Sequence, residues 1–190
     1  MPGDEEIDFE KFDLVEAFLK GVPGKDRGEK IERKSWDDYF MDLAHLVASR
    51  STCRRHNVGA VLVGEGMEII STGYNGAVRG SKDCLELGCL RDQLGIESGT
   101  RHEICRAVHA EQNAIINAAR QGVSTLNSTM YVTINPCLIC AKMIINAGVK
   151  RVVYEGTYPD KVGVEFLKSM GVIVENYKTD RLDRYVTKKY

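Results

Sequence analysis

Two short motifs place metal-binding side chains at the start of two amphipathic segments. His109 and Glu111 begin one segment, and Cys137 and Cys140 begin the next, directly after Pro136. Two cysteines three residues apart share one face of a helix, so both sulfurs can reach a single ion. The amino end of a helix also lowers the pKa of a thiol. The motifs therefore predict that His109, Cys137 and Cys140 bind Zn²⁺ and leave a fourth position for water.

Glu111 follows His109 at a spacing that lets its carboxylate lie beside such a metal at the helix entrance. Zinc lowers the pKa of its bound water to about 7, and a neighbouring carboxylate can carry the proton. H-x-E combined with P-C-x-x-C is the signature of zinc deaminases. Each motif alone is weak, because C-x-x-C also occurs in thioredoxin-like dithiols and buried thiols need no metal. Together they predict a catalytic zinc site with Glu111 as the proton shuttle.

The composition is that of a globular protein with little affinity for nucleic acid. The 190 residues include 26 basic and 27 acidic side chains, which gives a net charge of −1. A polynucleotide surface would need clustered lysine and arginine. The longest apolar run, residues 58–64, falls far short of the roughly 20 residues that span a bilayer. The amino terminus is acidic, unlike a signal peptide. We therefore expect a cytoplasmic protein whose six cysteines are reduced.

Hydrophobic periodicity predicts an α/β domain over residues 35–176. Ser35 is a predicted helix cap, and the alternation of helical and strand patterns implies a hairpin followed by βαβ crossovers. The expected strands are 58–63, 68–74, 129–133, 151–154 and 172–174, and the expected later helices are 110–119, 136–147 and 163–170. This order predicts a three-layer α/β/α sandwich with a mixed five-stranded sheet. Residues 1–34 are expected to form an extension with a short helix and a linker, and residues 177–190 a tail.

A long segment of weak periodicity, residues 77–108, separates the hairpin from the first motif. Loops of this length within compact domains usually have a function or lack order. Cys84, Cys89, His102 and Cys105 lie close together in this sequence. Buried thiols without a metal are one interpretation, and a second metal site is the other.

Residues 35–176 resemble the cytidine deaminase superfamily, and the deoxycytidylate (dCMP) deaminases and late-competence deaminase-like proteins of bacteria in particular. Besides the zinc motifs, the shared sequences are S-T-C-R-R (51–55), V-G-A-V (58–61), S-T-G-Y-N-G (71–76) and H-A-E-Q-N-A-I (109–115). The resemblance implies a cytidine deaminase-like fold and zinc-dependent hydrolysis of dCMP to dUMP and ammonia, which supplies thymidylate synthesis. The alternatives are deamination of another cytosine or adenine nucleotide, or a non-catalytic zinc protein of DNA uptake. A scaffold would not need Glu111.

The resemblance also assigns substrate contacts. Glu111 would move a proton from water to N3 of cytosine, and backbone amides near Ala110 and Cys137 would hold the tetrahedral intermediate. Asn75 would bind the sugar hydroxyl, and Tyr158, or alternatively Tyr154, would stack on the base. The candidates for the 5′-phosphate are Asn113, Arg54, Arg55, Arg79 and Lys82.

By similarity to some relatives, Cys53 and Cys84 would bind a second, structural Zn²⁺. His102 and Cys105 would complete its ligands, with Cys89 as a substitute. The resemblance further implies a homo-oligomer, from dimer to hexamer. The nucleotides dCTP and dTTP would be activating and inhibiting effectors that act at residues 73–80.

Overall fold

The computed structural model describes residues 13–20, 33–156 and 161–177. The chain divides into two compact units, residues 1–33 and 34–190. The described element of the first unit is helix α1 (Leu14–Lys20), and every other element belongs to the second unit. Within the described ranges, no helix combines the length and the apolar character that a membrane crossing requires.

The second unit is built on a mixed sheet with the strand order β2-β1-β5-β6-β7. β2 pairs antiparallel with β1, β1 pairs antiparallel with β5, and β5, β6 and β7 run parallel. The strands are β1 (Gly59–Val63), β2 (Ile69–Tyr74), β5 (Thr129–Val132), β6 (Arg151–Tyr154) and β7 (Ile173–Asn176). The predicted mixed sheet of five strands is confirmed, with strand ends shifted by one or two residues.

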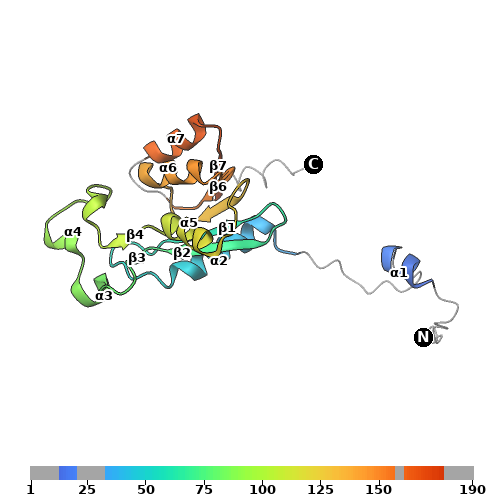
Figure 1. Ribbon diagram of the computed structural model, residues 1–190, viewed down its shortest axis with the longest axis horizontal. Helices are drawn as coiled ribbons and strands as arrows, with labels where there is room; N and C mark the ends of the chain where they lie inside the picture. The colour runs from blue at the N-terminus through green and yellow to red at the C-terminus, as the bar shows by residue number, and fades with distance from the viewer. Residues whose placement is uncertain (1–12, 21–32, 157–160, 178–190) are drawn as a thin grey trace, which may run out of the picture. The chain divides into compact units, whose positions relative to one another are not determined.

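Helices cover both faces of this sheet (Figure 1). On one face, α2 (Trp36–Ala48) packs its Phe40 against Val61 and Val63 of β1. On the other face, α5 (Ala110–Gln121) packs against β1, whose alternate residues Ala60 and Leu62 point into this core. The helices α6 (Leu138–Asn146) and α7 (Val162–Ser169) complete the same hydrophobic core. The period-two alternation of β1 therefore supplies both hydrophobic cores. The predicted cap is also confirmed, since Ser35 Oγ accepts a hydrogen bond of 3.1 Å from the backbone N–H of Asp38.

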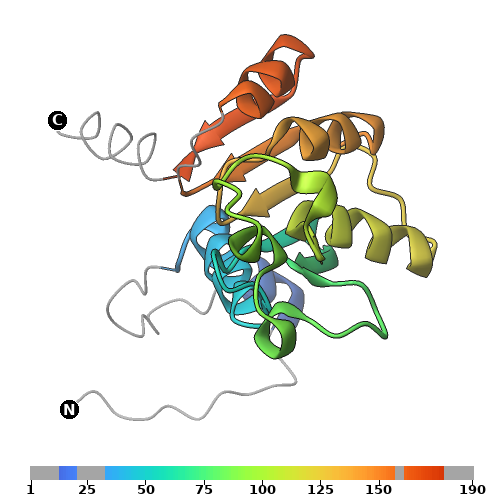
Figure 2. The same ribbon diagram turned by 90° about the vertical axis from the view of Figure 1, so that its left-hand side faces the viewer.

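The segment between β2 and α5 contains short elements rather than an extended loop. Its two-residue strands pair antiparallel, and it extends from the end of the domain where α5 begins (Figure 1). Figure 2 turns this segment toward the viewer. Its elements are β3 (Gly76–Ala77), α3 (Cys84–Leu87), α4 (Leu90–Gln93), the 3-10 helix η1 (His102–Ile104) and β4 (Ala107–Val108).

Glycine allows two helices to approach the hairpin closely. A Cβ atom on Gly59 would lie 2.1 Å from the carbonyl oxygen of Ala44 in α2. A Cβ atom on Gly73 would lie 2.2 Å from the carbonyl oxygen of Ala110 and 2.3 Å from the nitrogen of Ala114, both in α5. Because these contacts are with backbone, no side chain can move to make room. Gly73 therefore fixes the distance between β2 and the amino end of α5.

We expect Gly73→Ala to lower the free energy of unfolding by about 2 kcal/mol, because the added methyl overpacks the β2–α5 contact. The matched control is Thr72→Ala, an exposed neighbour on the same strand, for which a change within about 0.5 kcal/mol is expected. Urea denaturation followed by circular dichroism measures both. Equal stability of the two variants would contradict the close approach.

Candidate metal and catalytic site

His109 is held at the amino end of α5 by its own backbone. It occupies the N-cap position, in extended conformation. Its backbone N–H donates a hydrogen bond of 2.9 Å to the side-chain oxygen of Gln112, three residues along the helix. This bond satisfies the backbone donor that lies outside the helix. The imidazole is therefore placed just before the first turn, and Glu111 lies within that turn.

Cys137 and Cys140 are placed by the start of α6. Cys137 is the N-cap residue, and Cys140 lies in the first turn, where it is completely buried. Gly163 of α7 packs on the backbone just before this helix. A Cβ atom at Gly163 would lie 2.2 Å from the carbonyl oxygen of Pro136 and 2.7 Å from the carbonyl carbon of Cys137. The third helix of this layer therefore fixes the loop that carries the first thiol.

The ligand atoms of His109, Cys137 and Cys140 converge. Nδ1 of His109 lies 3.5 Å from Sγ of Cys137 and 3.3 Å from Sγ of Cys140. Zinc bond lengths of about 2.3 Å to sulfur and about 2.0 Å to nitrogen, at a tetrahedral angle, would separate such atoms by about 3.5 Å. The three residues therefore fit zinc. Within the described part of the chain, they form the one group of His, Cys, Asp or Glu residues with three ligand atoms within 4.8 Å of one another.

The protonation of the cluster also suits a cation. A hydrogen bond from Cys140, assisted by one from His109, lowers the pKa of Cys137 to about 3 despite the cost of burial. The same hydrogen bond, together with burial, raises the pKa of Cys140. Burial lowers the pKa of His109, but the hydrogen bond to Cys137 more than offsets this and the net pKa is raised. One thiolate is therefore present before a metal binds, and metal binding must displace the other protons.

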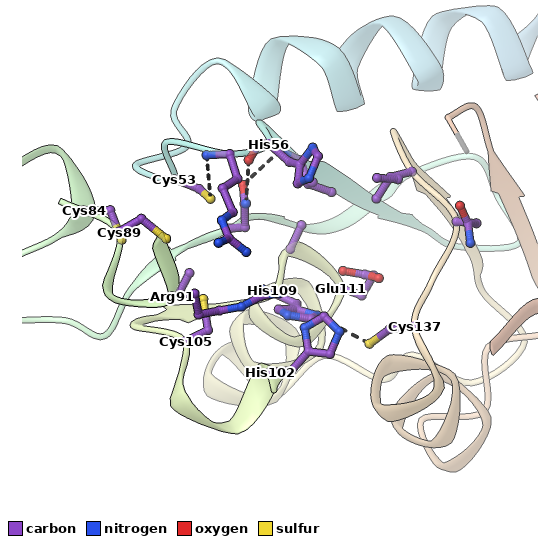
Figure 3. A pocket seen from close by; sticks show the side chains of 17 residues that line it. Cys53, His56, Cys84, Cys89, Arg91, His102, Cys105, His109, Glu111 and Cys137 are labelled. Atoms are coloured by element: carbon purple, nitrogen blue, oxygen red, sulfur yellow. Dashed lines mark hydrogen bonds between the residues drawn. The ribbon is translucent and has the colours of Figure 1, made fainter. Parts of the chain in front are cut away.

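Glu111 lies beside this group in the same pocket (Figure 3). Its residue is only 3% exposed. Burial raises the pKa of its carboxyl group, and the positive charge of His109 opposes this rise. Of the described residues that line the pocket, Glu111 is the one carboxylate. A buried carboxylate next to three metal ligands can accept a proton and return it near neutral pH.

Only some of the residues predicted to contact substrate line the pocket. Ala110 and Asn75 line the pocket. Asn75 also holds the preceding loop, since its Oδ1 accepts from Ser51 Oγ (2.6 Å) and the backbone N–H of Val58 (2.9 Å). Its Nδ2 donates to the carbonyl of His56 at 2.8 Å. Asn75 thus shapes the pocket mouth at the G-Y-N-G turn.

Asn113 and Tyr154 make other contacts. Asn113 is outside the set of pocket-lining residues, and its Nδ2 donates to the carbonyls of Tyr74 (2.7 Å) and Val108 (3.4 Å). Its amide braces β2 and β4 against α5, and the expectation that it binds substrate stays a prediction. Tyr154 packs on the hydrophobic core, and Tyr158 lies outside the described residues.

The residues predicted to bind a second ion line one pocket, but one of them also contacts His109. Cys53, Cys84, Cys89 and Cys105 line one pocket, together with His109, Glu111 and Cys137. Burial raises the pKa of Cys84, and the nearby charges of the other three cysteines raise it further. The expected ligand His102 lies instead against His109, with ring centroids 5.0 Å apart in an edge-to-face contact. His102 also lines this pocket, so its role as a ligand, implied by the resemblance, stays a prediction, and Cys89 lies near the other thiols.

Sequence reasoning missed Arg91, which is buried and lines the pocket. It belongs to α4, a four-residue helix in the weakly periodic segment. An arginine between Leu90 and Asp92 carries no local signal that distinguishes a pocket residue from a surface residue.

Comparison with known proteins agrees with this geometry. The family model described as "Cytidine and deoxycytidylate deaminase zinc-binding region" matches residues 34–156. A deoxycytidylate deaminase of Schizosaccharomyces pombe is 41% identical over 146 residues, which are 76% of this chain and 45% of that protein. The ComE operon protein 2 of Bacillus subtilis is 39% identical over 80% of this chain and 76% of its own length.

A solved structure adds a bound substrate. The crystal structure of dCMP deaminase from the cyanophage S-TIM5 in complex with dCMP and dUMP has a TM-score of 0.64 and 33% identity, and covers 77% of this chain and 99% of that chain. The chain spans about half the length of the fungal relatives. Because the family model matches most of this chain and the three expected zinc ligands converge, the chain belongs to the cytidine and deoxycytidylate deaminase family.

Proposed function

We propose that the protein catalyses the hydrolytic deamination of dCMP to dUMP and ammonia, which supplies dUMP for thymidylate synthesis. The observation that carries this proposal is the buried carboxylate of Glu111 beside the converging side chains of His109, Cys137 and Cys140. The similarity to a full-length phage enzyme solved with dCMP and dUMP supports the choice of substrate.

The chain's own residues supply the proton transfers. Zn²⁺ held by His109, Cys137 and Cys140 would activate water for attack at neutral pH. As oxygen adds to C4 of cytosine, Glu111 accepts a proton from water and delivers it to N3. Glu111 then assists departure of the C4 amino group as ammonia. Its burial suits this role, because a raised pKa lets one carboxyl group both accept and donate. The amino ends of α5 and α6 direct backbone N–H groups of Ala110 and Cys137 toward developing negative charge.

Two other functions remain as alternatives with distinct readouts. One is deamination of another cytosine or adenine nucleotide. The other is a non-catalytic role in DNA uptake, for which the similarity to ComE operon protein 2 is the motivating observation. The presence of Glu111, which a scaffold does not need, favours catalysis. Assays with dCMP, cytidine and dCTP separate the substrates.

We expect Glu111→Gln to reduce turnover of dCMP by at least about 1,000-fold while the zinc content stays unchanged, because the proton carrier is lost and the ligands remain. Absorbance of the cytosine ring measures turnover, and plasma mass spectrometry measures zinc. Glu86→Gln, an exposed residue of α3, is the matched control and should retain full activity. Activity that survives in Glu111→Gln would refute the mechanism.

We further propose a second, structural Zn²⁺ bound by the four thiols of Cys53, Cys84, Cys89 and Cys105. All four cysteines line one pocket, and the other three lie near enough to Cys84 to raise its pKa, although their sulfurs would have to draw together around the ion. Cys89 takes the fourth position in this proposal because the ring of His102 contacts His109. Four cysteines make a closed structural zinc site. Such an ion would link the loop before β1, which carries Cys53, to α3 and to the segment before β4.

Zinc counting tests this second site. We expect about two zinc ions per chain in the wild type and about one in Cys89→Ser, because loss of one of four ligands opens the structural site. His102→Asn should keep both ions. One zinc ion in the wild type, or loss of an ion from His102→Asn but not from Cys89→Ser, would overturn the assignment.

The remaining proposals follow from the family resemblance. We propose a homo-oligomer, from dimer to hexamer, with dCTP and dTTP as effectors acting near residues 73–80. We also propose a cytoplasmic location, which is consistent with six free cysteines. The roles of residues 1–34 and 177–190 stay predictions as a peripheral extension and tail.

A further inference from the structure

Arg91 is a buried cation with little of its hydrogen-bonding capacity used. Its residue is 5% exposed. Nη2 donates to the carbonyl of Glu97 at 2.7 Å, and its own carbonyl accepts from the backbone N–H of Ile96 at 2.8 Å. Nε is buried and has no hydrogen-bond partner. The loop that follows α4 therefore fixes the position of the guanidinium without satisfying it.

Among the residues that the structure describes, no carboxylate forms an ion pair with Arg91. The adjacent Asp92 instead accepts a hydrogen bond of 2.8 Å from Nε of Arg55. Arg151, which is part-buried, is in contrast paired with both Asp37 and Glu175. A buried guanidinium without a counter-charge is costly, and buried charges in proteins are normally paired. Arg91 has thiols but no paired carboxylate around it in this pocket, and its buried Nε is free to donate to an anion from outside the chain.

The position of Arg91 shows where that anion would lie. Arg91 lines the same pocket as Glu111 and His109. Figure 3 shows Arg91 and Glu111 both near His109 in this pocket. A ligand whose base reaches Glu111 can thus extend its other end toward Arg91.

We propose that Arg91 binds the 5′-phosphate of the nucleotide and so selects a nucleotide over a nucleoside. This assignment rests on the proposed function. The planar guanidinium presents several donors in a fork that matches phosphate oxygens. Arg54, Arg79 and Lys82, the cations expected from sequence, are exposed and do not line the pocket.

Arg55 has a secondary place in this subsite. It lines the pocket, and its Nη1 is buried without a hydrogen-bond partner. Its other nitrogens are engaged by Asp92 and by the carbonyl of Ile96 at 2.6 Å. Because its charge is already paired, Arg55 can add one hydrogen bond to a phosphate, whereas Arg91 supplies the unpaired charge.

Binding of product separates this role from catalysis. We would titrate zinc-loaded wild type, Arg91→Met and Arg91→Lys with dUMP, deoxyuridine and inorganic phosphate by calorimetry. Arg54→Met is the matched control, since it removes the same charge from an exposed position nearby. We expect Arg91→Met to weaken dUMP binding by about 100-fold, because a hydrogen-bonded charge is lost. Deoxyuridine binding should stay within about threefold, and Arg54→Met should match the wild type for both ligands.

The outcomes distinguish a phosphate contact from a structural role. Unchanged affinity for dUMP in Arg91→Met, or parallel losses for dUMP and deoxyuridine, would overturn the proposal. If Arg91→Met does not fold, Arg91→Lys decides: it keeps the charge but not the fork, and we expect about a tenfold loss for dUMP alone. Wild-type dUMP affinity in that variant overturns the assignment.

The test of Arg91 does not depend on whether the protein deaminates dCMP. If the wild type does not deaminate dCMP, the inorganic phosphate titration still tests Arg91. Binding in the wild type that is lost in Arg91→Met supports the anion site, and equal binding in both refutes it.

Discussion

The site depends on the meeting of two helix amino ends. α5 brings His109 and Glu111, and α6 brings Cys137 and Cys140, so a small shift of either helix would separate the ligand atoms. Gly73 limits the height of α5 above the sheet, and Gly163 holds the backbone that leads into α6. Both contacts are between backbones that no side chain separates. The same two helix ends provide partial positive charge toward the space where substrate would react.

The pocket contains a buried carboxyl group, Glu111, and a buried guanidinium group, Arg91. Glu111 is buried beside the metal ligands, and Arg91 is buried near the loop after α4. Both burials cost folding free energy, since neither group has the water it would have in the unfolded chain. The hydrophobic packing on the two faces of the sheet provides the stability that offsets this cost. A transferred proton would neutralise Glu111, and the proposed phosphate would pair with Arg91.

The sequence predicted those parts of the molecule that local pattern determines. Alternation along β1 and the helical period of α5 and α6 gave the sheet and its layers, and Cys137 and Cys140 were visible because their spacing lies within one helix. The segment 77–108 has no such period, so the placement of Arg91 depends on how the segment packs as a whole. The resemblance favoured His102 over Cys89 as a ligand of a second ion, whereas in the structure His102 contacts His109 and Cys89 lies near the other thiols. Asn113 was expected at the substrate, but its amide is used by the carbonyl of Tyr74.

The central claim is that one imidazole and two thiolates hold a single zinc ion at the junction of α5 and α6. Crystals of the wild-type protein, measured at wavelengths on both sides of the zinc absorption edge, test it most directly. We predict an anomalous peak within bonding distance of His109 Nδ1 and of the sulfurs of Cys137 and Cys140. A map from fully active protein with no zinc peak between these three atoms would contradict the account.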